Sequence, residues 1–207
     1  MKKRWDSLIK RSQDFLNILI DSERADIIFE YCIKVSYSKN RYYHTLKHIN
    51  SVLNAIQDFK LSPEERVKIE WAIWFHDYIY DVKSTNNEQK SAEQFKIITG
   101  YIRMEKEVIE EIAKLIIITK HDKEPETKLE KIICDGDLKE LASLNHLKNV
   151  KNIRLEYSFL NDEEWKKGRK EFLEFMLNKK YIFHTNEYRN LYKKQARDNL
   201  QLELNNI

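Results

Sequence analysis

The chain has 207 residues, of which 42% are hydrophobic and 12% aromatic, and this content excludes the disordered class because it can form a substantial core. The 37 Lys and Arg are interspersed among 34 Asp and Glu, so the formal charge of +3 contains no basic block that would indicate a nucleic acid polymer as partner. Only 3 Gly and 2 Pro are present, which disfavours a turn-rich β architecture and predicts long helices with short connections.

Helical spacing of apolar residues begins near the N-terminus. It predicts helices over 2–20, over 27–35 with an end before 38–40, and over 44–59. The clearest helix start is Ser62-Pro63-Glu64-Glu65, in which a capping serine precedes a proline and a glutamate stands at the third helical position. The helix that follows is apolar almost all round in its second half, so we expect it to be buried on several sides and to end at His76-Asp77.

The remainder of the chain continues this helical pattern. Further helices are expected over 87–99, 104–120, 129–143, 145–160, 162–178 and 186–204. Gly100 is placed to end the first of them, and 121–128 indicates a loop. No repeat or low-complexity linker marks a boundary, so we predict a single domain over 1–207. Its core would span about 25–145, with C-terminal helices over about 145–205 packed on it.

Targeting and cysteine signals are weak. The N-terminus begins with basic residues but has no continuous apolar stretch, so a signal peptide is not predicted. No long uncharged apolar run predicts a transmembrane span, and a cytoplasmic location without a membrane partner follows by default. Cys32 and Cys134 lie far apart and match no zinc spacing, so we interpret them as buried free thiols.

Three groups of ionisable residues stand out. His44 and His48 are four residues apart and so share one helix face, His76 and Asp77 end a buried helix, and an Asp-Gly-Asp occupies 135–137. Each has an ordinary alternative, because a lone histidine near a core is usually hydrogen-bonded there and Asp-Gly-Asp is usually a turn. Together they predict a divalent-metal site, since buried carboxylates are costly unless they are paired or bind a metal.

These residues belong to segments that resemble a known family. In order they are Tyr43-His44-Thr45-Leu46-Lys47-His48-Ile49, Ala72-Ile73-Trp74-Phe75-His76-Asp77, Asn87-Glu88 with Ser91-Ala92, Asp135-Gly136-Asp137-Leu138, Ile153-Arg154-Leu155-Glu156-Tyr157, Gly168-Arg169, Ile182-Phe183 and Ala196-Arg197-Asp198-Asn199-Leu200. They resemble the HD superfamily of metal-dependent phosphohydrolases, most closely its bacterial branch of predicted HD phosphohydrolases. The resemblance covers about 41–204 and implies an all-α fold, an HD-domain helical bundle with additional C-terminal helices.

The resemblance also implies a set of metal ligands. These would be His48, with His44 as the rival, then His76 and Asp77, and finally Asp137, with Asp135 as the rival. Residues two apart on a helix point about 200° away from each other, so only one of the two aspartates should reach the metal, and Asp135 would instead cap the start of the helix. The cofactor would be one divalent metal ion, and Mn, Fe, Ni, Zn, Co and Mg all remain open.

Further roles in catalysis and binding follow from the same resemblance. Asp77 would also hold or deprotonate the attacking water. Asp81 would aid hydrolysis, in a Tyr80-Asp81 pair where guanosine-tetraphosphate hydrolases have Glu-Asp; the alternative is a loop carboxylate. The expected phosphate partners are Arg41, His44, Lys47 and His121, although solvated surface charge is the alternative for the Arg and the Lys. Three C-terminal arginines, Arg154, Arg169 and Arg197, are expected to pair with Glu156, Glu171 or Asp198 in buried structural networks.

The expected function is that of a metal-dependent phosphohydrolase. It would act on a small phosphorylated molecule, with a nucleotide as the leading candidate, by metal-activated attack of water. The alternative is a catalytically silent regulatory module that binds a metal or nucleotide. A cyclic-dinucleotide phosphodiesterase ranks lower because the Gly-Tyr-Pro element of that branch is absent. The number of phosphates and the formation of a homodimer are left open.

Overall fold

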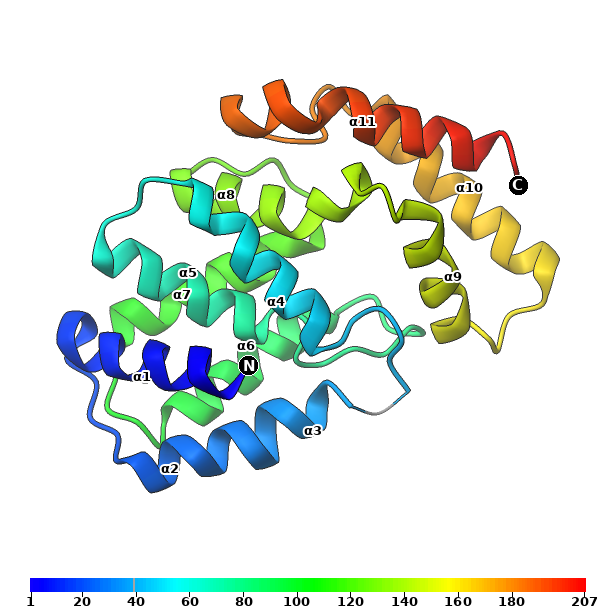
Figure 1. The fold of residues 1–207 in the computed structure, drawn as a ribbon. Coiled ribbons are helices and arrows are strands. Elements are labelled where there is room, and N and C mark those ends of the chain that lie inside the picture. Colours follow the sequence, from blue (N-terminus) through cyan, green and yellow to red (C-terminus); the bar gives the residue numbers. More distant parts are fainter. Residues whose placement is uncertain (39) are drawn as a thin grey trace.

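Helices make up nearly all the regular structure of the computed structural model, which describes residues 1–38 and 40–207 (Figure 1). Apart from one antiparallel bridge between Leu19 and Arg103, these residues form no β-structure. The all-α class predicted from the sequence is therefore confirmed. No helix within the described ranges is long and apolar enough to cross a membrane.

The N-terminal helices differ in their ends from the predicted ones. The first, α1 (Lys2–Leu16), stops before residue 20 because Asn17 takes a left-handed conformation with φ 51°. The second starts earlier than expected, at Asp21, whose side chain accepts the amide proton of Arg24. It runs through α2 (Ser22–Ile27), the π-helical η1 (Ile28–Ile33) and α3 (Lys34–Ser36). The end expected before 38–40 includes residue 39, which lies outside the described residues.

The central helix is α5 (Pro63–Phe75), and its predicted capping box is present. Ser62 accepts the amide proton of Glu65, and the Glu65 carboxylate accepts that of Ser62. The second half of the helix is fully buried, as expected, and its rings pack against α1: Trp5 lies edge-on to Trp71 and Trp74, with ring centroids 5.3 and 5.5 Å away. This packing fixes α5 in the core up to its last turn.

Loss of the cap on α5 is expected to lower the stability of the whole fold. Ser62→Ala removes the acceptor of the Glu65 amide, which costs about 1 kcal/mol. For a chain of this size, thermal unfolding followed by circular dichroism should show a fall in Tm of about 2–4 °C. Ser158→Ala serves as the control, because that serine is exposed. Equal melting temperatures for the two variants would contradict the role of the cap.

Six further helices precede the last helix of the chain. The first three are α4 (Leu46–Ala55), α6 (Asn87–Thr99) and α7 (Lys106–Ile117), and the others are α8 (Lys128–Leu138), α9 (His146–Glu156) and α10 (Asp162–Asn178). Short 3-10 turns extend three of the helices, namely η2 (Ile56–Asp58) after α4, η3 (Ile118–Lys120) after α7 and η4 (Lys139–Ala142) after α8. The predicted helix over 129–143 is thus divided between α8 and η4.

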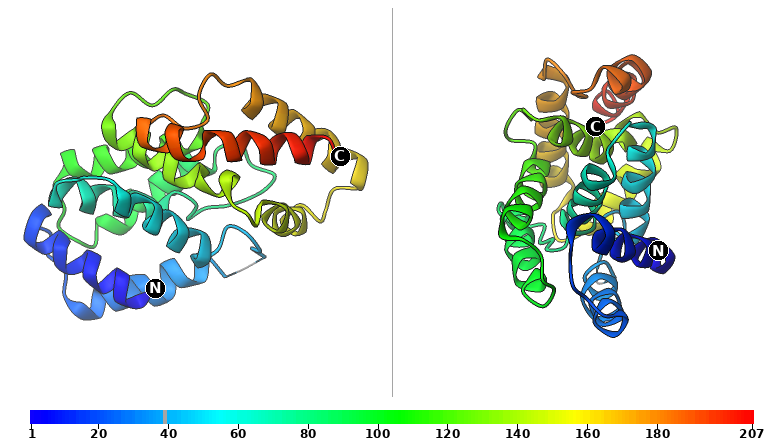
Figure 2. Two further views of the ribbon diagram at one scale, coloured as in Figure 1. Left: turned by 45° about the horizontal axis from the view of Figure 1, so that its top comes forward. Right: turned by 90° about the vertical axis from the view of Figure 1, so that its left-hand side faces the viewer.

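The last helix, α11 (Asn186–Leu204), packs on α10 and on η4. Both views of Figure 2 place α10 and α11 at the opposite end of the molecule from α2 and α3. The sequence predicted both C-terminal helices with the bounds that the structure has. The three arginines of this part pair differently from the prediction: Arg169 with Glu203, Arg154 with the exposed Asp162 and two carbonyls, and Arg197 with carbonyls alone.

Candidate metal centre

Four ionisable side chains converge where α4, α5 and α8 meet. The Nε2 atoms of His48 and His76 are 3.2 Å apart, and Oδ1 of Asp137 lies 3.0 Å from the first and 3.4 Å from the second. Oδ2 of Asp77 lies 3.2 Å from Nε2 of His76 and 3.5 Å from that of His48. One ligand atom each from His48, His76 and Asp137 falls within 4.8 Å of the others, so this group could hold a metal ion.

The close approach of α4 and α8 brings His48 next to Asp137. A Cβ added to Gly136 would lie 3.4 Å from side-chain carbons of both Val52 and Ile56, so the backbone of α8 is in van der Waals contact with this side of α4 and η2. Ile49 and Val52 are buried, which fixes the face of α4 that carries His48. The packing of α8 on α4 and η2 at Gly136 thus brings the neighbouring Asp137 to the site.

The end of α5 is held by side chains from the segment before α4. Tyr37 donates its hydroxyl proton to the carbonyl of Trp74 over 2.9 Å, and Arg41 donates to the carbonyls of Asp77 (2.6 Å) and Tyr78 (3.0 Å). Carbonyls at a helix end have no partner within the helix, so these bonds satisfy them and fix the backbone that carries the doublet. His76 in turn donates from Nδ1 to the carbonyl of Ile73 over 2.9 Å. Nε2 therefore faces the site and is the ring nitrogen that could bind a metal ion, which is the arrangement that metal-binding histidines use.

The electrostatics of the cluster favour a positive charge at its centre. Burial alone would lower the pKa of His76, but Asp77 and Asp137 raise it well above its ordinary value. Burial alone would raise the pKa of Asp137, but hydrogen bonds from His121, His48 and His76 hold it well below its ordinary value. Oδ2 of Asp77 and Nδ1 of His48 are sealed from solvent without a hydrogen-bond partner among the described residues. A nitrogen and oxygen donor set with an unpartnered buried carboxylate oxygen fits a divalent cation.

His121, directly after η3, contacts the cluster. Its Nε2 lies 2.9 Å from Oδ2 of Asp137, so it binds the carboxylate oxygen that faces away from His48 and His76. The residue has φ 58°, a left-handed conformation that costs energy in any residue other than glycine, and Lys179 holds its carbonyl oxygen over 3.1 Å. The geometry suits a residue that orients the Asp137 carboxylate.

A cavity of about 540 Å³ opens from the metal cluster. His48, Asp77 and Asp137 form part of its wall. Residues of α6, η3, η4, α9 and α10, together with loop residues such as Tyr43 and Tyr80, line other parts of it. This volume is typical of sites that bind small molecules. The cluster therefore lies where a small ligand can reach it.

The residues predicted to bind phosphate or aid catalysis are divided between the cavity and the surface. His44 and His121 line the cavity. Arg41, Lys47 and Asp81 are absent from its wall as far as the described residues go. The Arg41 guanidinium binds the carbonyls at the end of α5, Lys47 is exposed, and Asp81 is exposed with its carboxylate on the amide of Lys83.

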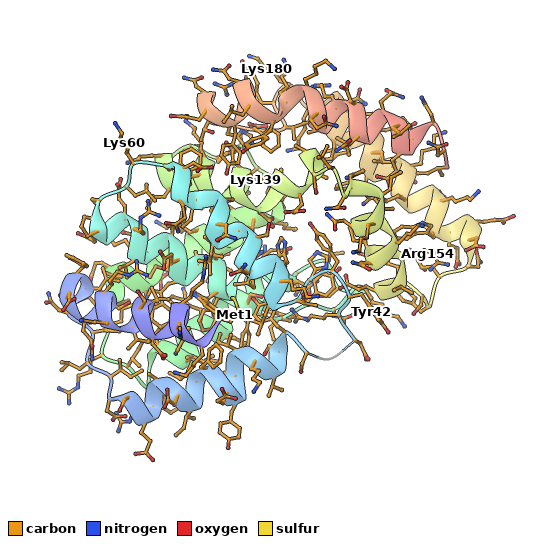
Figure 3. All side chains as sticks on the ribbon, in the orientation of Figure 1. Met1, Tyr42, Lys60, Lys139, Arg154 and Lys180 are labelled. Atoms are coloured by element: carbon orange, nitrogen blue, oxygen red, sulfur yellow. The ribbon has the colours of Figure 1, made fainter. Side chains whose placement is uncertain are left out.

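Glu156 at the end of α9 organises the segment before α4, a role that the sequence reasoning missed. One carboxylate oxygen accepts the backbone amide protons of Tyr42, Tyr43 and His44, and the other lies 2.7 Å from Nδ1 of His44 and accepts the hydroxyl proton of Tyr80. Burial opposes ionisation, but the His44 contact and these amides lower the pKa of Glu156 to about 2. Figure 3 shows the side chains between the segment of Tyr42 and the helix of Arg154.

The expected role of Asp135 is wrong. The residue does not cap its own helix, because α8 begins at Lys128 with Thr127 as its cap. Asp135 is fully buried in the last turns of α8, where it accepts the amide proton of His184 (2.6 Å) and the amide and hydroxyl protons of Thr185 (2.8 and 2.5 Å). It thus fixes the start of α11, while Asp137, two residues on, lies beside the histidines.

Comparisons with protein-family models, with curated proteins and with solved structures find no match to this chain. The molecule is a helical protein in which two histidines and an aspartate from three helices form a group that could bind a metal ion. The geometry of that group and of its cavity carries the functional argument.

Proposed function

We propose that the chain is a metal-dependent phosphohydrolase of the HD superfamily that acts on a small phosphorylated molecule, with a nucleotide as the leading candidate. The observation that carries the proposal is the convergence of His48, His76, Asp77 and Asp137, of which all but the buried His76 line a cavity of about 540 Å³. Site-directed removal of these ligands is the test, and it is developed in the Discussion.

A divalent cation held by these four residues would polarise a phosphoryl oxygen and lower the pKa of a water molecule. The protein's own groups have separate tasks in this proposal. Asp77, whose carboxyl pKa is lowered by the neighbouring histidines despite its burial, is ionised and accepts a proton from the attacking water. His121 orients Asp137, and both His44 and His121 donate hydrogen bonds to phosphate oxygens in the cavity.

Glu88 is a further group that we assign to this reaction. It lines the cavity, and burial, followed by the charge of Asp77, raises the pKa of its carboxyl. A raised pKa favours the protonated carboxyl, which is the form that could pass a proton to the oxygen of the leaving group. The balanced step forms a bond from phosphorus to the water oxygen and breaks the ester bond, with the water proton going to Asp77 and the leaving oxygen protonated by Glu88.

Hydrolysis is expected to proceed without a covalent intermediate on the enzyme. Cys134 is buried in α8, and burial raises the pKa of its thiol, so it is a poor nucleophile. A single turnover in isotopically labelled water should therefore place the label in the released phosphate, as mass spectrometry would detect. Unlabelled phosphate from a single turnover would contradict direct attack by water.

A further inference from the structure

The cavity has a second wall, formed by α9 and α10, that differs in chemistry from the metal cluster. Beside the polar His146, Asn149 and Arg169, these helices contribute a group of apolar or aromatic side chains that are half-buried, together with an exposed glycine. We call this group the α9–α10 wall: Val150, Ile153, Tyr157, Trp165, Gly168 and Phe172. The other three tryptophans of the chain are fully buried in the core, whereas Trp165 faces this cavity. Apolar side chains exposed in a concave site are typical of a surface that binds the apolar part of a ligand.

Gly168 in this wall has no structural explanation in terms of the protein alone. It lies inside α10, where a glycine costs roughly 0.5–1 kcal/mol relative to alanine. No described glycine has a positive φ, and a Cβ added to Gly168 would meet no described atom within 4 Å. Neither its backbone conformation nor its packing therefore requires glycine. The missing side chain leaves open space in the cavity next to Trp165 and Phe172 in the helix.

The charges around the cavity provide for one phosphate group. Among the described residues, Lys120 and Arg169 supply the only Lys or Arg side chains in the wall. Lys120 pairs with Asp122 at 3.0 Å, and Arg169 is bound by both carboxylate oxygens of Glu203 at 2.6 and 3.1 Å. Four carboxylates also line the cavity, namely Asp77, Glu88, Asp137 and Glu140. A second or third phosphate would meet this acidic wall, in which Arg169 is bound by Glu203 and Lys120 already has a carboxylate partner.

We infer that the substrate is a compact monophosphate ester whose organic part carries an apolar ring system, and that the ring packs on the α9–α10 wall. Gly168 then determines how large a ring is accepted. This inference rests on the proposed function, because it assumes that the phosphate lies at the metal cluster. Rings stack favourably on Tyr, Trp and Phe, and burying the ring supplies binding energy far from the reacting bond.

The test measures binding of three non-hydrolysable probes to the metal-loaded full-length chain by calorimetry. The probes are methylphosphonate, phenylphosphonate and 1-naphthylphosphonate, which share one head group and differ only in the ring. In the wild type, affinity should rise about tenfold at each step, given about 25 cal/mol per Å² of buried apolar area. Gly168→Leu should weaken the binding of naphthylphosphonate about tenfold or more, because the leucine occupies the space in which the ring would bury its apolar area. The affinity for methylphosphonate, which has no ring, should not change.

Glu171→Leu is the matched control. It places the same leucine on α10 at an exposed residue outside the cavity lining, so it should bind all three probes as the wild type does, whereas Gly168→Ala should weaken naphthylphosphonate less than Gly168→Leu does. A parallel assay compares kcat/KM for phenyl phosphate and phenyl diphosphate, and the monophosphate should be preferred.

Two sets of results overturn the inference in distinguishable ways. Metal-dependent binding of methylphosphonate without any gain from the rings, an unchanged series in Gly168→Leu, or preference for the diphosphate would refute the ring and monophosphate assignment alone. Failure of all three phosphonates to bind in a metal-dependent manner would refute the proposed function and this inference with it.

Discussion

His76→Ala is expected to abolish phosphate release and leave a folded helical protein. The imidazole lies between Asp77 and Asp137, and among the described residues its one hydrogen bond to a backbone group is to Ile73 in its own helical turn. The rest of α5 is anchored by its rings, which the substitution does not touch. Turnover should fall by more than about 100-fold, because loss of even the outer partners of metal ligands costs 10–100-fold.

The measurement combines a phosphate-release assay with circular dichroism on the same preparation. His184→Ala is the matched control: that side chain is also buried, but it pairs with Glu124 and does not line the cavity. It should retain metal and turnover. Normal turnover in His76→Ala would mean that the chain does not hydrolyse phosphate esters at this site.

Asp137→Asn and Asp135→Asn should fail in opposite ways, although they lie two residues apart on α8. Asp137→Asn keeps the shape of the side chain but removes the charge between His48, His76 and His121. It should weaken metal binding and turnover by roughly 100-fold or more. Unfolding should change little, since the contacts of Asp137 lie within the polar cluster.

Asp135→Asn should instead lower stability and leave metal binding intact. The carboxylate accepts three hydrogen bonds from His184 and Thr185, and an amide NH₂ group would point a donor at one of these donors. An unsatisfied buried group of this kind costs about 1–3 kcal/mol. Thermal unfolding and metal titration of the two variants measure both effects, and an exchange of their behaviour would show that Asp135 is the ligand.

The helices that the sequence predicted best are those whose signals are local. The capping box at Ser62, and the bounds of α10 and α11, depend on residues within one or two turns of each other. The end of α1 was missed because the left-handed Asn17 stops the helix although apolar residues continue beyond it. The start of α2 was missed because the capping Asp21 begins the helix before the first apolar residues of the pattern. The resemblance to the HD superfamily named the residues that the fold brings together at the cluster.

The surroundings of the cluster could not be predicted because their partners are distant in sequence. Arg41 binds the carbonyls of Asp77 and Tyr78, which lie beyond both α4 and α5 in the chain, and nothing near Arg41 in the sequence indicates this. Glu156 binds amides of residues more than a hundred positions earlier. Asp135 likewise binds the start of α11, so its role depends on the docking of the C-terminal helices.

Metal stoichiometry tests the central claim most directly. The purified chain, stripped of metal and then titrated with Mn²⁺ or Co²⁺, should bind one ion per chain, as elemental analysis after desalting would show, and His48→Ala should lose that ion. The bound ion is expected to restore phosphate release. Well under one ion per chain in the wild type after addition of either metal, or the same stoichiometry in His48→Ala, would contradict the metal centre.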